Sequence, residues 1–300
     1  MALSPVDEIR RAWSSRRPYQ TVSWAIGAAL IVGGLVHLAV FAFDTRPWAG
    51  PVSWRKPATF GLSFGLTTLT LAWISGLLRY RRMLAVATLA VAVGSLVEVS
   101  LVAMQAWRGV PSHFNQATGF DSAVFSLMGI TVAVIAAGIV VITFYAFRSF
   151  DADPAMVVGV RVGLLVLLAA QALGAAIIGN GLALGQSPTQ TNLATFGEAG
   201  AMKVPHAVTM HGIQILPIYA LLLASTSLAP RRRRNLMWVG AAGYAGLALA
   251  SVLQTFQGRA PLSLTPVSGA IVLLSALLGG LAIVGLAAES SSGKPQDIGS

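Results

Sequence analysis

The sequence has 300 residues, of which 55% are hydrophobic and only 10% are charged, and its mean hydropathy is +0.74. Soluble domains carry about 25% charged residues, so this composition excludes a water-soluble globular protein. The absence of cysteine excludes disulfides, thiolate metal ligands and cysteine nucleophiles. The formal net charge of +10 does not indicate nucleic-acid binding, because the cations lie at the ends of apolar runs, where they act as topology signals.

Eight apolar runs are long enough to span a bilayer, whose hydrocarbon core of about 30 Å requires about 20 helical residues. The fifth run could begin near Ala155 if the side chain of Arg161 reaches to the interface. The pattern predicts an all-α integral membrane bundle of about eight transmembrane helices. We expect the spans at 22–43, 57–78, 83–107, 122–147, 162–184, 205–228, 236–256 and 267–288.

Lys and Arg are distributed unevenly between alternate connections. If the N-terminus is inside, 14 of the 20 cations fall on the cytoplasmic side, as the positive-inside rule requires. Both termini are therefore predicted to be cytoplasmic. We divide the chain into a cytoplasmic interfacial segment at 1–18, a transmembrane domain at 19–288 and a disordered tail at 289–300.

All four histidines fall on the predicted outer side of the membrane. His37 lies near the outer end of the first span, His113 lies in the loop between the third and fourth spans, and His206 and His211 open the sixth span. Imidazole nitrogen binds haem iron, copper and zinc, so all four are candidate metal ligands. The alternative is that an intramembrane histidine donates a hydrogen bond to a neighbouring helix.

Glu98 is the single acidic residue inside a predicted hydrophobic core. An ionisable group in lipid is costly, so we expect Glu98 to face the bundle interior and to have a partner, or to be a neutral acid bonded to a backbone carbonyl. Gln105 and Ser95 lie on the same helical face. At about 1.5 Å per residue, His37 and His211 lie at a depth similar to that of Glu98. The three could share a cavity open to the outside, with His113 or His206 contributing from above.

The outer loops are rich in residue types that are typical of ordered loops. The loop at 44–57 contains three prolines with Trp48 and Trp54, which is typical of a stiff interfacial cover. Arg55 and Lys56 follow it and would hold lipid phosphates or the acidic groups of a cofactor. The loop from Arg108 is rich in turn and hydrogen-bonding residues, so we expect it to fold over the site as a lid.

Three motifs resemble a family of functionally unassigned bacterial multi-pass membrane proteins. They are WRKP at 54–57, Gln105 with RGVPSHFN at 108–115, and KVPH at 203–206 with His211, Gln214 and Pro217. The resemblance implies location in the bacterial plasma (inner) membrane and implies no activity. A looser likeness, of layout alone, is to heme A synthase, which also has eight helices and histidine haem ligands. Candidate cofactor-binding residues are Arg55, Lys56, Gln105, Arg108, Asn115 and Gln214.

The leading functional hypothesis is a centre of haem b or a transition metal ion near the outer surface, which serves redox chemistry or sensing. Gly33 and Gly34, one turn before His37, would leave room for a flat macrocycle or would allow close helix packing. Respiratory or quinone-linked membrane proteins are candidate partners, besides the lipid bilayer itself.

Three other functions stay open. A zinc-dependent membrane hydrolase would use Glu98 or Asp121 as its catalytic carboxylate. A proton-coupled transporter would use Glu98, Arg161 and a sixth helix broken at Pro217. A non-catalytic assembly factor is the third of these alternatives.

Overall fold

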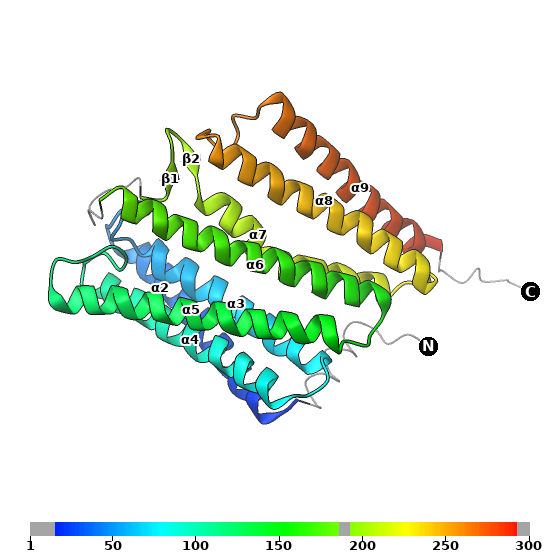
Figure 1. Ribbon diagram of the computed structural model, residues 1–300, viewed down its shortest axis with the longest axis horizontal. Coiled ribbons are helices and arrows are strands. Elements are labelled where there is room, and N and C mark those ends of the chain that lie inside the picture. The colour runs from blue at the N-terminus through cyan, green and yellow to red at the C-terminus, as the bar shows by residue number, and fades with distance from the viewer. Residues whose placement is uncertain (1–15, 186–192, 293–300) are drawn as a thin grey trace, which may run out of the picture. The chain divides into compact units, whose positions relative to one another are not determined.

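The computed structural model of the protein describes residues 16–185 and 193–292, with side chains up to residue 286. Within the described residues, eight helices are long and apolar enough to cross a membrane, which confirms the predicted all-α membrane fold (Figure 1). Most of the predicted interfacial segment, and residues 293–300 of the predicted tail, lie outside the described residues. The helices are α2 (Pro18–Phe43), α3 (Arg55–Leu77), α4 (Arg82–Trp107), α5 (Gly119–Arg148), α6 (Pro154–Ala183), α7 (Lys203–Ala224), α8 (Pro230–Phe256) and α9 (Pro266–Ser292).

Local capping explains where several of these helices begin. α6 begins at Pro154, the earlier of the two expected positions, because Asp153 Oδ1 accepts a hydrogen bond from the N–H of Ala155 and Pro154 fits the first helical turn. At the start of α5, Thr118 Oγ1 accepts from the N–H of Asp121 at 3.1 Å. α7 is continuous through Pro217, so the break expected there is absent. The missing N–H of Pro217 costs one intrahelical bond without ending the helix.

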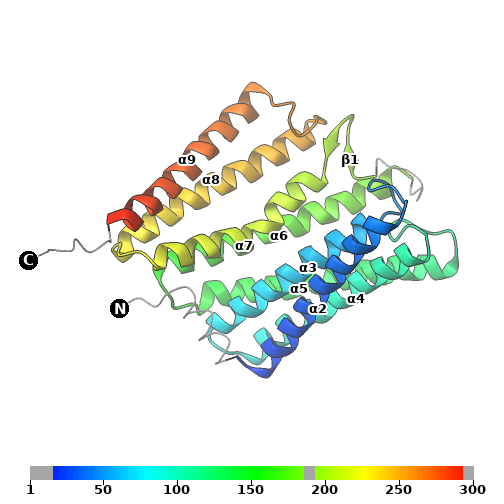
Figure 2. The same ribbon diagram turned by 180° about the vertical axis from the view of Figure 1, so that it is seen from behind.

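The chain divides into two compact units. The N-terminal unit contains Arg16–Ser149 and Gln171–Thr195, and so holds α2 to α5 and the second part of α6. In this unit α2 and α3 lie side by side, as both ribbon views show (Figure 2). Glycines allow this close approach: a Cβ on Gly34 would lie 2.9 Å from the carbonyl oxygen of Ala58, and a Cβ on Gly61 would lie 2.8 Å from the Cα of Gly34.

In its described part, the C-terminal unit contains Phe150–Ala170 and residues 196–292. It holds the first part of α6 with α7, α8 and α9, and the two short strands β1 (Thr195–Phe196) and β2 (Gly200–Ala201) pair at its start. α8 and α9 lie side by side, and Tyr219 of α7 donates a hydrogen bond to the carbonyl of Ala282 in α9 at 3.0 Å.

Candidate functional site

Glu98 is buried in the N-terminal unit, with 1% of its surface exposed. It lies on α4, and its Oε2 atom is 2.8 Å from the hydroxyl oxygen of Thr131 on α5. The two other polar residues of this helical face, Ser95 and Gln105, are also buried. The polar face of α4 is therefore turned toward protein rather than lipid, as an intramembrane carboxyl group requires.

The second neighbour of Glu98 is His113, from the loop between α4 and α5. Its Nε2 atom lies 3.9 Å from Glu98 Oε1, and its side chain is 23% exposed. The Nδ1 atom of His113 lies 3.0 Å from Ser112 Oγ, and Phe60 of α3 contacts the imidazole edge to face. Lys56, also on α3, interacts electrostatically with Glu98. His113 thus gives a buried carboxyl group a titratable neighbour that is itself partly exposed.

Thr131 can satisfy Glu98 in both of its protonation states. Its hydroxyl oxygen lies 2.8 Å from Glu98 Oε2 and 2.9 Å from the carbonyl oxygen of Met128. When Glu98 is ionised, the single hydroxyl proton of Thr131 donates to the carboxylate. When Glu98 is protonated, the acid donates to Thr131 Oγ1, and Thr131 donates to Met128 instead. In both states Glu98 Oε2 keeps its hydrogen bond with Thr131, so a proton can bind and leave this oxygen without loss of that contact.

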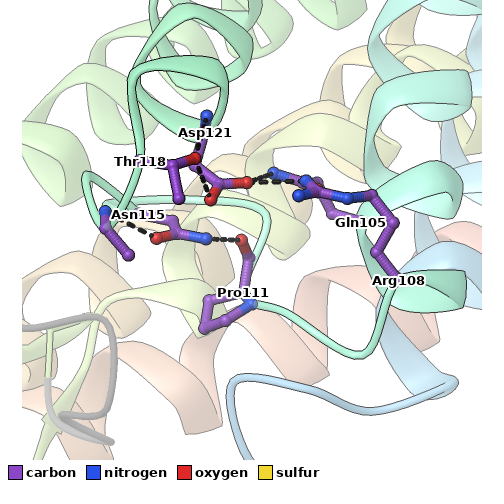
Figure 3. A network of polar contacts seen from close by, with 7 residues as sticks. Gln105, Arg108, Pro111, Asn115, Thr118 and Asp121 are labelled. Carbon is purple, nitrogen blue, oxygen red and sulfur yellow. Dashed lines mark hydrogen bonds and ion pairs between the residues drawn. The ribbon is translucent and has the colours of Figure 1, made fainter.

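A network of polar side chains around the buried Asp121 fixes both ends of the loop that carries His113 (Figure 3). Asp121 accepts from Gln105 Nε2 at 3.0 Å and from Arg108 at 2.6 Å through one carboxylate oxygen, and from Thr118 Oγ1 at 2.6 Å through the other. Arg108 also donates to the side chain of Gln105. The predicted catalytic role of Asp121 has no support in this arrangement, because both of its oxygens hold the loop.

The middle of the loop has its own anchors. Asn115 donates to the carbonyl of Pro111 and accepts from the N–H of Ala117, both at 3.1 Å, so its amide shapes the loop (Figure 3). Phe114, at a φ of 57°, is buried against Phe125 and against Gly181 of α6. A Cβ on Gly181 would lie 2.4 Å from the Phe114 ring. The expected lid is therefore a folded cap, in which the residues on either side of His113 are held in place.

His37 belongs to a separate aromatic cluster in the same unit. Its Nδ1 atom lies 2.7 Å from the carbonyl oxygen of Gly33, which can only accept, so Nδ1 carries the proton. Its Nε2 atom then accepts from the indole of Trp107 at 3.2 Å, and the ring stacks on Trp54 with centroids 5.8 Å apart. Both nitrogens are engaged, so His37 would have to give up the bond from Trp107 before it could bind a metal.

The loop between α2 and α3 closes over this cluster. Arg46 donates to Asp44 and to the carbonyl of Ala106, and its guanidinium lies 4.0 Å from the centroid of the Trp54 ring. Hydrogen bonds from Arg46 lower the pKa of Asp44 to about 2. Trp54 is 1% exposed and so is a core residue, whereas Trp48 is exposed, as an interfacial tryptophan would be. Arg55 donates to the carbonyl of Trp48 and so closes the same loop.

The remaining predicted residues lie on α7 in the C-terminal unit. His206 donates from Nδ1 to the carbonyl of Ala170 on α6 at 2.9 Å, which ties these two helices together. His211 is half-buried and Gln214 is buried, at 5% exposure. Among the described residues, no three His, Asp or Glu side chains gather closely enough to hold a metal ion.

Comparison of the chain with protein-family models, with curated proteins and with solved structures gave no match. The site therefore has to be interpreted from its own geometry.

The residues of the site that were not singled out in the sequence include Thr131, Trp107 and Phe114. Thr131 had a weak signal, since it lies about as deep in α5 as Glu98 lies in α4 and is one of few polar residues there. Trp107 and Phe114 had none, because aromatic residues are common at helix ends and in outer loops of any membrane protein.

Proposed function

We propose that this membrane protein exchanges protons between the buried Glu98 and the outer face of the membrane through His113, and that this exchange drives a proton-coupled carrier. The observation that carries the proposal is the position of Thr131, whose hydroxyl can serve Glu98 whether the acid is charged or neutral. A carboxyl group held only for structure needs one partner in one state. A carboxyl group that must load and unload a proton needs partners in both.

The contact with His113 supports the same function. Histidine changes charge between about pH 5 and 8, so it can pass a proton at physiological pH. The gap of 3.9 Å between His113 and Glu98 is too long for a direct hydrogen bond and is spanned by a small rotation of either side chain or by one water molecule. Ser112, on the other nitrogen of the ring, can accept or donate as the imidazole changes tautomer.

Infrared difference spectroscopy tests this proposal. Protein in bilayers should show a carboxyl band that changes as the pH is varied, and Glu98→Gln should remove it. The matched control is Glu198→Gln, at an exposed acid, which should leave the band in place. Thr131→Val should perturb the band, and Thr131→Ser should restore it, because serine keeps the hydroxyl. A band that survives in Glu98→Gln contradicts the proposal.

Proton flux into vesicles tests the coupling. His113→Gln should slow proton uptake by about two orders of magnitude, the usual contribution of a positioned acid or base, without removing the Glu98 band. If uptake in His113→Gln equals that of the wild type, His113 is not on the path.

A further inference from the structure

A pocket lies at the predicted cytoplasmic end of the C-terminal unit, far along the chain from Glu98. It has a volume of about 500 Å³ and is formed between the start of α6 and the start of α8. Its lining residues are Ala152, Pro154, Val157, Val158, Arg234, Asn235 and Trp238. The proposed proton exchange makes no use of this pocket.

An ion pair holds the two walls of the pocket together. Arg233 donates to Asp153 Oδ2 at 2.6 Å, with both side chains mostly buried, and also reaches the carbonyl of Ala224 at the end of α7. Arg233 and Asp153 neutralise each other, and their role is to hold the two walls of the pocket together. Arg234, the next residue, is exposed and lines the pocket.

The charge around the pocket is positive. The run Arg231 to Arg234 supplies four cations at the start of α8, and among the described residues the connection before α6 supplies two carboxylates, Asp151 and Asp153. The guanidinium of Arg234 is a planar fork of N–H donors that matches a phosphate group, and Asn235, which also lines the pocket, has a side-chain amide that can donate as well.

The apolar part of the pocket lies one turn further into the membrane. Trp238 follows Arg234 by four residues and so lies on the same face of α8, with 53% of its surface exposed. Tryptophan in such a position is typical of the level at which lipid headgroups meet acyl chains. Val157 and Val158 of α6 line the facing wall. The pocket is therefore cationic at its mouth and apolar below.

We propose that this pocket binds the headgroup of an anionic phospholipid, with the phosphate on Arg234 and Asn235 and the upper acyl chain against Trp238 and Val157. The order of polar and apolar groups along α8 matches the order within the lipid. The lipid would join α6 to α8 beside the Arg233 ion pair, and so would stabilise the C-terminal unit.

This proposal is tested by native mass spectrometry. The protein is taken from bilayers of phosphatidylcholine that contain a minor share of phosphatidylglycerol. The wild type should retain one phosphatidylglycerol molecule in preference to phosphatidylcholine. Arg234→Gln should weaken this retention by about 10 to 100-fold, as expected for loss of a charge-assisted contact to phosphate. The matched control is Arg231→Gln, which removes the same charge from the same run outside the lining and should weaken retention by at most about 5-fold.

Three results would overturn the proposal. Equal weakening in Arg234→Gln and Arg231→Gln would mean that diffuse charge alone attracts the lipid. Equal retention of phosphatidylcholine would mean that the pocket does not select anions. Displacement of the lipid by inorganic phosphate at low concentration would identify a site for soluble phosphate instead. Trp238→Leu checks the apolar part and should also weaken retention, with the fold of each variant checked by circular dichroism.

Discussion

Gly34 and Gly33 are neighbours on α2, yet alanine at the two positions should have opposite effects. A Cβ on Gly34 would lie 2.9 Å from both the carbonyl oxygen of Ala58 and the N–H nitrogen of Leu62, whereas a Cβ on Gly33 meets nothing within 4 Å. Ordinary contact begins at 3.4 Å. The α3 backbone would therefore have to move away by about 0.5 Å, which loses roughly a quarter of the dispersion energy of each affected contact.

The size of the effect follows from the two positions together. Overpacking of this kind costs about 1–3 kcal/mol. Replacement of glycine by alanine inside a helix returns about 0.5–1 kcal/mol, and this term is common to both variants. Gly33→Ala should therefore unfold with a free energy equal to or slightly above that of the wild type, and Gly34→Ala should be less stable than Gly33→Ala by about 1–3 kcal/mol.

The difference in unfolding free energy can be measured by reversible unfolding of the two variants in mixed micelles. Circular dichroism follows the loss of helix as the fraction of denaturing detergent rises. Equal stability of the two variants would refute the packing argument. It would also reopen the possibility that the space beside Gly34 accommodates a flat macrocycle rather than α3.

The other predictions concern the loop, the aromatic cluster and the topology. Gly181→Val should displace the Phe114 ring and with it His113, and so slow proton uptake. Gly179→Val, at a position where a Cβ meets no other atom, should not slow it. Equal uptake in both variants would mean that the contact between Phe114 and Gly181 is not needed for the proton path. The pKa of Asp44 is lowered, so the contribution of its bonds to Arg46 should be complete above the ordinary pKa of about 4 and be lost as the pH falls through about 2. Oxidative labelling of Trp54 should rise only below about pH 2, and in Asp44→Asn it should be raised already at neutral pH. If the bond from Trp107 occupies His37, purified protein should show no haem absorbance and no stoichiometric metal, and a haem band that His37→Ala abolishes would contradict this. Reporters fused after Arg82 and Arg234 should be cytoplasmic, and those near Asn115 and Ser187 external, although Ser187 lies outside the described residues; the opposite labelling of either pair would invert the membrane orientation.

The helices could be predicted from the sequence because a lipid bilayer restricts the structures that a chain can adopt within it. A helix in the bilayer must satisfy its own backbone and needs about 20 apolar residues, so length and hydropathy locate it. Hydropathy does not locate a boundary that capping decides, as at Pro154, whose helix begins well before the apolar run that contains Val162. The continuity of α7 through Pro217 was missed, since a proline signals a lost hydrogen bond but does not say whether packing holds the helix together.

The site could be predicted only in part. Glu98 stood out because a lone acid in an apolar helix needs an explanation, and His113 was one of two residues expected to approach from above. The pairing of His37 with Trp107, and of Phe114 with Gly181, depends on how distant segments pack, for which spacing along one chain carries no signal. A histidine that donates a hydrogen bond cannot be distinguished in the sequence from one that binds a metal. The His37 cluster could therefore be recognised only from the three-dimensional structure.

The most direct test of the central claim is the side from which Glu98 receives its proton. The chain has no cysteine, so a single Ala117→Cys substitution in the exposed part of the His113 loop would report which way each protein is inserted in a vesicle. The pH is then lowered on one side only, and the carboxyl band of Glu98 is followed over time. We predict that the band responds at once when the pH falls on the side of the labelled loop, and only after slow equilibration when it falls on the opposite side. An immediate response from the opposite side, or an equally fast response from the side of the labelled loop in His113→Gln, would contradict a proton path through His113.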